Sequence, residues 1–124
     1  MVKQQNYEVI FYEDRQGRCP AQDFLDSLPV KVRAKAAKWI EKLQDHGPDL
    51  PRPYADIVRG KIRELRLVFA SNQYRFLYFF AQRRIIITHG FIKKADSVPE
   101  NELQRSENIM RDFEIRLSRG GVQL

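Results

Sequence analysis

The chain has 124 residues, of which 43% are hydrophobic and 31% charged, and its formal net charge at pH 7 is +6. This composition is typical of one folded domain over residues 1–124 and excludes a disordered chain. The single cysteine, Cys19, excludes an internal disulfide framework. Because the sequence contains neither a secretory signal nor a long apolar stretch, we expect no membrane span and a cytoplasmic location.

The first half of the chain predicts a strand followed by two helices. Residues 6–12 are rich in β-branched and aromatic types, and they end at a polar turn. Apolar residues then recur at helical spacing between Pro20 and Pro29. A longer helix begins at Lys31 and ends at Gly47. Its apolar stripe is Val32, Ala36, Trp39, Ile40 and Leu43, and four lysines lie mostly off that stripe: Lys31, Lys35, Lys38 and Lys42. We expect a helix hairpin.

The second half predicts a sheet and a final helix. Residues 48–60 contain three prolines and read as an irregular connection. Three strand patterns follow closely, at residues 62–69, 74–80 and 84–92, and their short connectors require an antiparallel meander of three strands. Ser97 and Glu100 form the pattern of a capping box, which predicts a helix that runs to about Leu117. The expected fold class is α+β.

Positive charge is concentrated in residues 59–94. This segment has a local net charge of +8, whereas the other 88 residues sum to −2. The segment holds one acid, Glu64, and nine basic residues: Arg59, Lys61, Arg63, Arg66, Arg75, Arg83, Arg84, Lys93 and Lys94. Such a density favours a polyanionic partner. Nucleic acid is favoured over a membrane surface because the basic residues lie in strand patterns and not on an amphipathic helix.

Two arginines stand out on the predicted strands. Alternation places Arg66 with Glu64, away from the main apolar set of its strand. Arg75 lies on a strand whose two faces are both largely apolar, as expected of a central strand. A guanidinium there needs an anionic partner, since an unpaired buried charge costs several kcal/mol. That partner is Glu64 on the neighbouring strand, or a phosphate, which arginine holds bidentately, or each in turn if Glu64 positions Arg75 until substrate arrives.

The segment 88–94 combines an aromatic residue with two lysines. A base of single-stranded RNA can stack on Phe91 while Lys93 and Lys94 contact phosphates. Alternatively, Phe91 belongs to the core, and His89, which alternates with Ile87 and Phe91, is a hydrogen-bonded core histidine. The chain's two histidines lie 43 positions apart without a local carboxylate cluster, so we expect neither a metal nor a cofactor.

The sequence resembles the HigB-like branch of the RelE/ParE toxin superfamily over nearly its whole length. The residues that carry the resemblance are Gly60-Lys61-Ile62-Arg63-Glu64-Leu65-Arg66, Tyr74-Arg75, Tyr78-Phe79, His89-Gly90-Phe91-Ile92-Lys93-Lys94 and Pro99. The resemblance implies a RelE-like fold and the toxin of a type II toxin–antitoxin system. It implies a ribosome-dependent mRNA endonuclease (an mRNA interferase) that acts in the A site by attack of a 2′-hydroxyl on the adjacent phosphate, without metal.

The resemblance also implies roles and partners. Arg66 and Arg75 match the strand arginines of the family, and Lys93 and Lys94 match its basic pair. The arginines would hold the phosphate, and the base would be Lys93 or Lys94, or Tyr78 or His89 if exposed. The implied partner is a HigA-like helix-turn-helix antitoxin, and operator DNA is contacted only through it.

Other basic residues and other functions complete the sequence-based hypotheses. Arg59, Lys61, Arg63, Arg83 and Arg84 are expected to attract ribosomal RNA without base specificity. Two alternative functions stay open at this point. One is a ParE-like inhibitor that binds gyrase without cleaving nucleic acid, and the other is a non-catalytic nucleic-acid-binding regulator.

Overall fold

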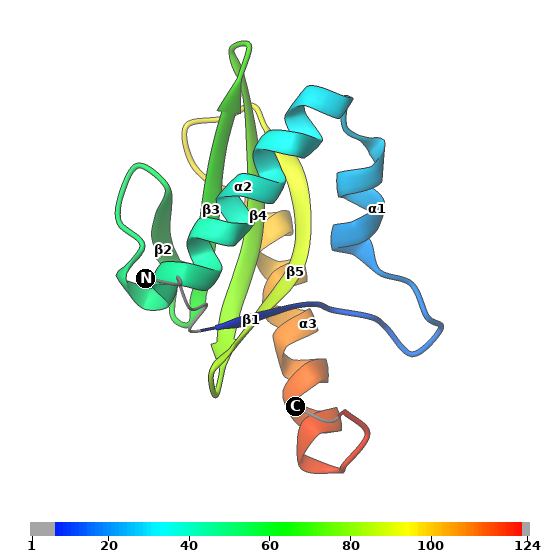
Figure 1. The fold of residues 1–124 in the computed structure, drawn as a ribbon. Coiled ribbons are helices and arrows are strands. Elements are labelled where there is room, and N and C mark those ends of the chain that lie inside the picture. The colour runs from blue at the N-terminus through cyan, green and yellow to red at the C-terminus, as the bar shows by residue number, and fades with distance from the viewer. Residues whose placement is uncertain (1–6, 123–124) are drawn as a thin grey trace.

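A five-stranded sheet forms the centre of the computed structural model, which describes residues 7–122 (Figure 1). The strand order is β1-β5-β4-β3-β2. The strands are β1 (Glu8–Phe11), β2 (Ala55–Arg59), β3 (Ile62–Phe69), β4 (Asn72–Ala81) and β5 (Arg84–Lys93). β2 to β5 form an antiparallel meander, and β1 pairs parallel to β5. The predicted α+β class and the three-strand meander are confirmed, and β2 extends that meander by one strand.

Helices cover both faces of the sheet (Figure 1). They are α1 (Pro20–Ser27), α2 (Val30–His46), the short 3-10 helix η1 (Gly47–Asp49) and α3 (Glu100–Ser118). The expected helix hairpin is therefore present as α1 and α2, which pack on one face, here called the α1/α2 face. α3 packs on the other, here called the α3 face.

Each face has its own hydrophobic core, and strand alternation decides which residue enters which core. On the α1/α2 face, the sheet contributes Leu65, Leu67, Tyr74, Phe76, Tyr78, Ile85 and Ile87. On the α3 face, it contributes Ile62, Leu77, Phe79, Ile86 and Phe91, which pack with Leu103 and Phe113 of α3. β4 supplies both cores, as predicted for a central strand.

Three local predictions are corrected by the structure. Residues 55–59 are not irregular, because they pair with β3 and so satisfy their backbone groups in the sheet. The first strand is shorter than residues 6–12, and residue 6 lies outside the described residues. The start of α3 has no side-chain cap: Pro99 occupies the N-cap position, and the expected bond of a Ser97 capping box is not formed.

A bulge in β5 changes the face on which His89 lies. Leu77 pairs with His89 and Tyr78 pairs with Ile87, so Thr88 is an extra residue in the strand. Its hydroxyl donates to the carbonyl of Leu77 (3.2 Å) and lies 2.8 Å from the Ser106 hydroxyl. Ile87 therefore faces α1 and α2, whereas His89 faces α3. The expected simple alternation of Ile87, His89 and Phe91 is wrong.

In the described part of the chain, no helix combines the length and the apolar character needed to cross a membrane.

Candidate functional site

Charged side chains from three neighbouring strands gather on the α3 face. The sheet register pairs Arg66 with Arg75, Arg75 with Phe91, and Gln73 with Lys93. Because directly paired residues point to the same face, Arg66, Arg75 and Lys93 lie together around Glu64. These four residues are named the basic cluster. The register thus brings together three of the four residues predicted to be catalytic.

Arg75 is the buried centre of the basic cluster. Its side chain is 1% exposed, and its Nε donates to Glu64 Oε1 at 3.0 Å. Nη1 donates to the carbonyl of Tyr74 at 3.1 Å, and Nη2 donates to Gln73 Oε1 at 2.8 Å. Burial lowers the pKa of Arg75, and the carboxylate of Glu64 opposes that shift. Glu64, one of the partners that the sequence left open, contacts Arg75, and all three guanidinium nitrogens of Arg75 donate to protein acceptors.

Arg66 and Lys93 form the accessible part of the basic cluster. The Arg66 side chain is 32% exposed, and its Nε lies 3.3 Å from Glu64 Oε1. Lys93 is half-buried. Burial lowers the pKa of Lys93, the charges of Arg75 and Arg66 lower it further, and Glu64 opposes the shift. A lysine with a lowered pKa carries a larger neutral fraction at neutral pH, as a general base requires.

A polar groove opens beside the basic cluster. Its volume is about 360 Å³, and it is lined by Ser71, Asn72, Gln73, Ile92, Lys93, Lys94, Ala95 and Asp96. Lys93 belongs to both the groove and the cluster. Gln73 lines the groove and accepts a hydrogen bond from Arg75. A phosphate in this groove would meet Lys93, Lys94 and Gln73, with the charge of Arg75 directly behind the Gln73 amide.

Gln73 is the residue of this site that the sequence reasoning missed. It precedes Arg75 by two positions on β4, so it shares the face of Arg75. The alternation of side chains along a strand could have identified Gln73. The sequence analysis instead left residues 70–73 between two strands as a connector. In the structure the turn consists only of Ala70 and Ser71, both at positive φ, and β4 begins at Asn72.

His89 and Phe91 lie beneath the site and not on its surface. His89 is 1% exposed, and its Nδ1 is 3.1 Å from the Thr88 hydroxyl. Its Nε2 lies 3.3 Å from Glu102 Oε1, without the alignment of a hydrogen bond. Phe91 is buried, with its ring 5.9 Å from that of His89. Both residues belong to the core, which was one of the two alternatives left open by the sequence. Neither ring is therefore exposed for stacking with a nucleobase.

Acid should destabilise the fold through His89. Burial lowers the pKa of His89 from 6.5 to about 4, and the charge of Arg105 acts in the same direction. The unfolded chain therefore binds this proton more tightly than the folded chain does. Stability is present above about pH 6.5 and is lost as the pH falls towards 4, by about 3 kcal/mol in total.

The pH dependence of the free energy of unfolding, from denaturant titrations, measures this effect. His89→Gln is the control: the slope between pH 6.5 and 4 should be shallower in that variant. Equal slopes in the two proteins would show that His89 is not the group responsible.

Three other predicted site residues lie away from the basic cluster. Tyr78 is 1% exposed on the α1/α2 face, and burial raises its pKa to about 12. Arg63 pairs with Tyr78 on the same face, and its guanidinium lies 5.2 Å from the Phe80 ring. Lys61 sits in the β2–β3 turn, 3.9 Å from Glu114 of α3. Tyr78 does not meet the condition of exposure that its role as a base requires. Arg63 and Lys61 lie outside the basic cluster.

Several cations of residues 59–94 are paired within the molecule. Arg59 bonds both Glu100 (3.0 Å) and Glu107 (2.7 Å) of α3, and Arg84 lies 3.6 Å from Glu8 of β1. These acids come from outside the segment, so the local count of +8 overstates its free charge. Among the described residues, Lys93 and Lys94 at the rim of the groove form no ion pair within 4.0 Å.

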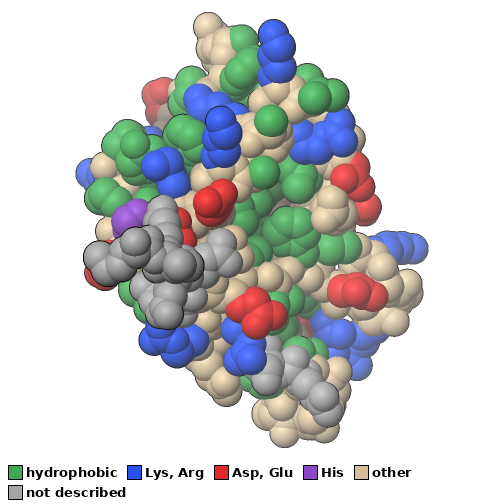
Figure 2. Space-filling view, viewed as in Figure 1, with side chains coloured by type: hydrophobic (Ala, Val, Ile, Leu, Met, Phe, Trp, Pro, Cys, Tyr) green, Lys and Arg blue, Asp and Glu red, His purple; other side chains and the backbone are tan. Residues whose placement is uncertain are grey.

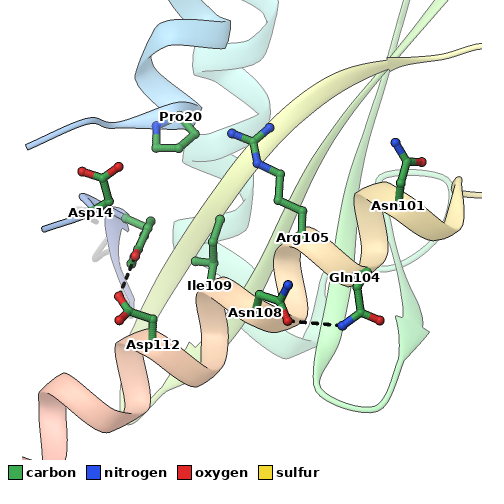
Figure 3. A pocket seen from close by; sticks show the side chains of 9 residues that line it. Asp14, Pro20, Asn101, Gln104, Arg105, Asn108, Ile109 and Asp112 are labelled. Atoms are coloured by element: carbon green, nitrogen blue, oxygen red, sulfur yellow. Dashed lines mark hydrogen bonds between the residues drawn. The ribbon is translucent and has the colours of Figure 1, made fainter. Parts of the chain in front are cut away.

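A larger cavity than the groove lies elsewhere, between the β1–α1 loop and the outer side of α3 (Figure 3). It measures about 550 Å³ and shares no lining residue with the basic cluster. Its carboxylate Asp112 accepts from the Tyr12 hydroxyl at 2.6 Å and from Arg15, and pairs with Arg116. The acceptor oxygens of Asp112 are therefore already satisfied within the protein. Within residues 7–122, no three His, Cys, Asp or Glu side chains are grouped to hold a metal ion.

An α+β fold with a basic groove on one sheet face defines a small protein suited to binding a polyanion. The family model described as Phage derived protein Gp49-like (DUF891) matches residues 23–111. The chain belongs to this phage-derived family, which is part of the RelE/HigB-like toxins. The family is consistent with the toxin of a toxin–antitoxin pair and suggests an antitoxin as partner. No curated protein matches the chain.

Proposed function

We propose that the chain is the toxin of a type II toxin–antitoxin system and a ribosome-dependent mRNA endonuclease of HigB-like type. The observation that carries the proposal is the basic cluster, where Arg66, Arg75 and Lys93 surround one carboxylate next to an open polar groove. The family supports the toxin class. The groove faces solvent on the α3 face, so a single strand of RNA can reach Lys93 and Lys94.

The reaction proposed is attack of a ribose 2′-hydroxyl on the adjacent phosphate. The 2′-oxygen forms a bond to phosphorus, the bond from phosphorus to the 5′-oxygen breaks, and the leaving 5′-oxygen takes a proton from solvent water. The products are a 2′,3′-cyclic phosphate and a 5′-hydroxyl. Lys93 in its neutral form accepts the 2′-hydroxyl proton, which its lowered pKa favours. Lys94 and Arg66 bind the phosphate and offset the charge that develops on its oxygens.

Arg75 has a different role from the one expected. It is a positioning residue, because its guanidinium fixes Glu64 and the Gln73 amide and adds positive potential behind the groove. It needs no contact with substrate to lower the pKa of Lys93. Direct bidentate binding of phosphate would require Arg75 to release Glu64 or Gln73.

The proposed partners follow from this function. mRNA lies in the groove, the ribosome presents it in the A site, and both are met in the cytoplasm. A HigA-like helix-turn-helix antitoxin neutralises the toxin and carries it to operator DNA.

Mapping of mRNA ends after induction tests the proposal. Primer extension should show new 5′ ends within codons of translated messages when the chain is expressed, and none with Lys93→Gln at equal protein level. Intact message combined with loss of DNA supercoiling would overturn it in favour of a gyrase inhibitor. Intact message with normal supercoiling would overturn it in favour of a non-catalytic regulator.

A further inference from the structure

Four lysines form a straight row along α2, on the opposite side of the sheet from the basic cluster. Lys31, Lys35, Lys38 and Lys42 follow the spacing i, i+4, i+7 and i+11. At 100° per residue these positions fall within an arc of about 60°, and the row is about 16 Å long. Val32, Ala36 and Leu43 of the same helix are buried against the sheet. These four residues are named the lysine row.

The row follows the seam between α2 and the strands. Lys35 Nζ donates to the carbonyl of Val68 on β3 and lies 5.0 Å from the Trp39 ring. Lys42 Nζ lies 5.3 Å from the ring of Tyr54, the residue that precedes β2. Lys31 and Lys38 are exposed; Lys38 lies between these two anchored lysines, and Lys31 lies one turn before Lys35. The row is therefore held in place at two points and leaves two ammonium groups in solvent.

The charge of the row is weakly compensated. Glu41 and Asp45 lie beside its C-terminal end, whereas the segment from Val30 to Ile40 carries no acid. No ion pair of Lys31 or Lys38 is present among residues 7–122. The face that carries α2 accordingly shows several basic side chains where that helix lies (Figure 2). This contrasts with Arg59 and Arg84, whose acids neutralise them.

We propose that the lysine row binds the phosphate backbone of double-helical RNA, as a second RNA surface separate from the groove. Lysine acts on phosphate as a point charge, and a rigid row of point charges fits a backbone whose phosphates are regularly spaced. The proposal rests on the proposed function in one respect only, that the ribosome is the source of the duplex.

An acidic protein segment is the less suitable occupant. Specific protein interfaces are centred on buried apolar or aromatic anchors. Here the ammonium groups of Lys35 and Lys42 lie over the two aromatic rings, so the row offers charge without an apolar recess. The position of the row also fits two RNA segments bound at once, with message on the α3 face and duplex on the α1/α2 face.

The test compares two double variants that remove the same charge. Lys31→Gln with Lys38→Gln removes the exposed members of the row, and glutamine keeps the helix propensity of lysine. Arg18→Gln with Arg119→Gln is the matched control, since both arginines are exposed and lie outside α2. Affinity for a short RNA duplex is measured by fluorescence anisotropy over a series of salt concentrations, with poly-glutamate as the second probe.

The lysine-row variant should lose on the order of tenfold in duplex affinity at low salt, and the slope of log K against log salt should fall by about two. The control should keep the wild-type slope. Equal losses in both double variants would overturn the proposal, because net charge alone would then explain binding. If the lysine-row variant loses affinity for poly-glutamate but keeps its affinity for the RNA duplex, the proposal is overturned in favour of a surface for acidic peptides.

Failure of the proposed function has a different signature. If induction leaves mRNA intact while the lysine-row variant still loses duplex affinity, the endonuclease assignment fails and the duplex surface stands. If mRNA is cut but the lysine-row variant keeps the wild-type salt slope of duplex binding, the endonuclease assignment stands and the duplex surface fails.

Discussion

Arg75→Ala should lower the free energy of unfolding by about 3–5 kcal/mol, because it leaves the buried carboxylate of Glu64 without its main partner. The pair joins a guanidinium that is 1% exposed to a carboxylate that is 10% exposed, at 3.0 Å. The substitution also removes the donors to the Tyr74 carbonyl and to Gln73. Urea titration followed by circular dichroism gives the free energy of unfolding.

Two further variants separate the ion pair from other causes. Arg66→Ala is the surface control: its side chain is 32% exposed, and its contact with Glu64 should contribute about 1 kcal/mol or less. Glu64→Gln with Arg75→Met removes both charges and should regain much of the loss, since no unpaired charge stays buried. An Arg75→Ala protein as stable as Arg66→Ala would refute a structural role and return Arg75 to the set of substrate-binding cations.

Lys93→Gln should slow mRNA cleavage by about 10²–10⁴-fold, the usual contribution of a positioned general base. Lys93 is half-buried at the rim of the groove, so the free energy of unfolding should change by less than about 1 kcal/mol. Single-turnover cleavage of ribosome-bound mRNA measures the rate. A merely structural residue would alter stability and rate together.

The variant Lys93→Arg shows whether Lys93 acts as a general base or only through its positive charge. Arginine keeps the positive charge but stays protonated at all accessible pH values. If Lys93 is the base, Lys93→Arg stays as slow as Lys93→Gln; recovery of the rate would mean that charge alone matters.

The pH profile gives a second readout for Lys93. A base is active when deprotonated, so the rate should rise with pH through the lowered pKa of Lys93. Arg66→Gln removes one of the charges that lower this pKa, and the rising limb should move to higher pH. If the rise of the rate occurs at the same pH in Arg66→Gln, or is still present in Lys93→Arg, the titrating group is not Lys93.

Local sequence patterns were sufficient for most of the fold. Alternation placed Glu64 and Arg66 on one face of β3, and it placed Arg75 on a central strand. The first placement holds because the pairing of β3 with β4 has no bulge, so side chains alternate strictly. The second holds because β4 lies inside the sheet between β3 and β5. Helical spacing likewise predicted α1 and α2. The strand β2 was missed because the prolines before it resemble a loop, and its backbone is satisfied only by pairing with β3.

The sequence by itself determined that Glu64 and Arg66 share one strand face and that Arg75 lies on a central strand, since residue type and strand parity are local properties. The sheet register is what brings Lys93 to them. Only the tertiary structure decided that Arg75 is buried on Glu64, that Thr88 turns His89 towards α3, and that Arg59 is paired with acids of α3. The physical reason is that burial and ion pairing depend on residues distant in the chain. A charge count along the sequence contains no information about which charges meet after folding.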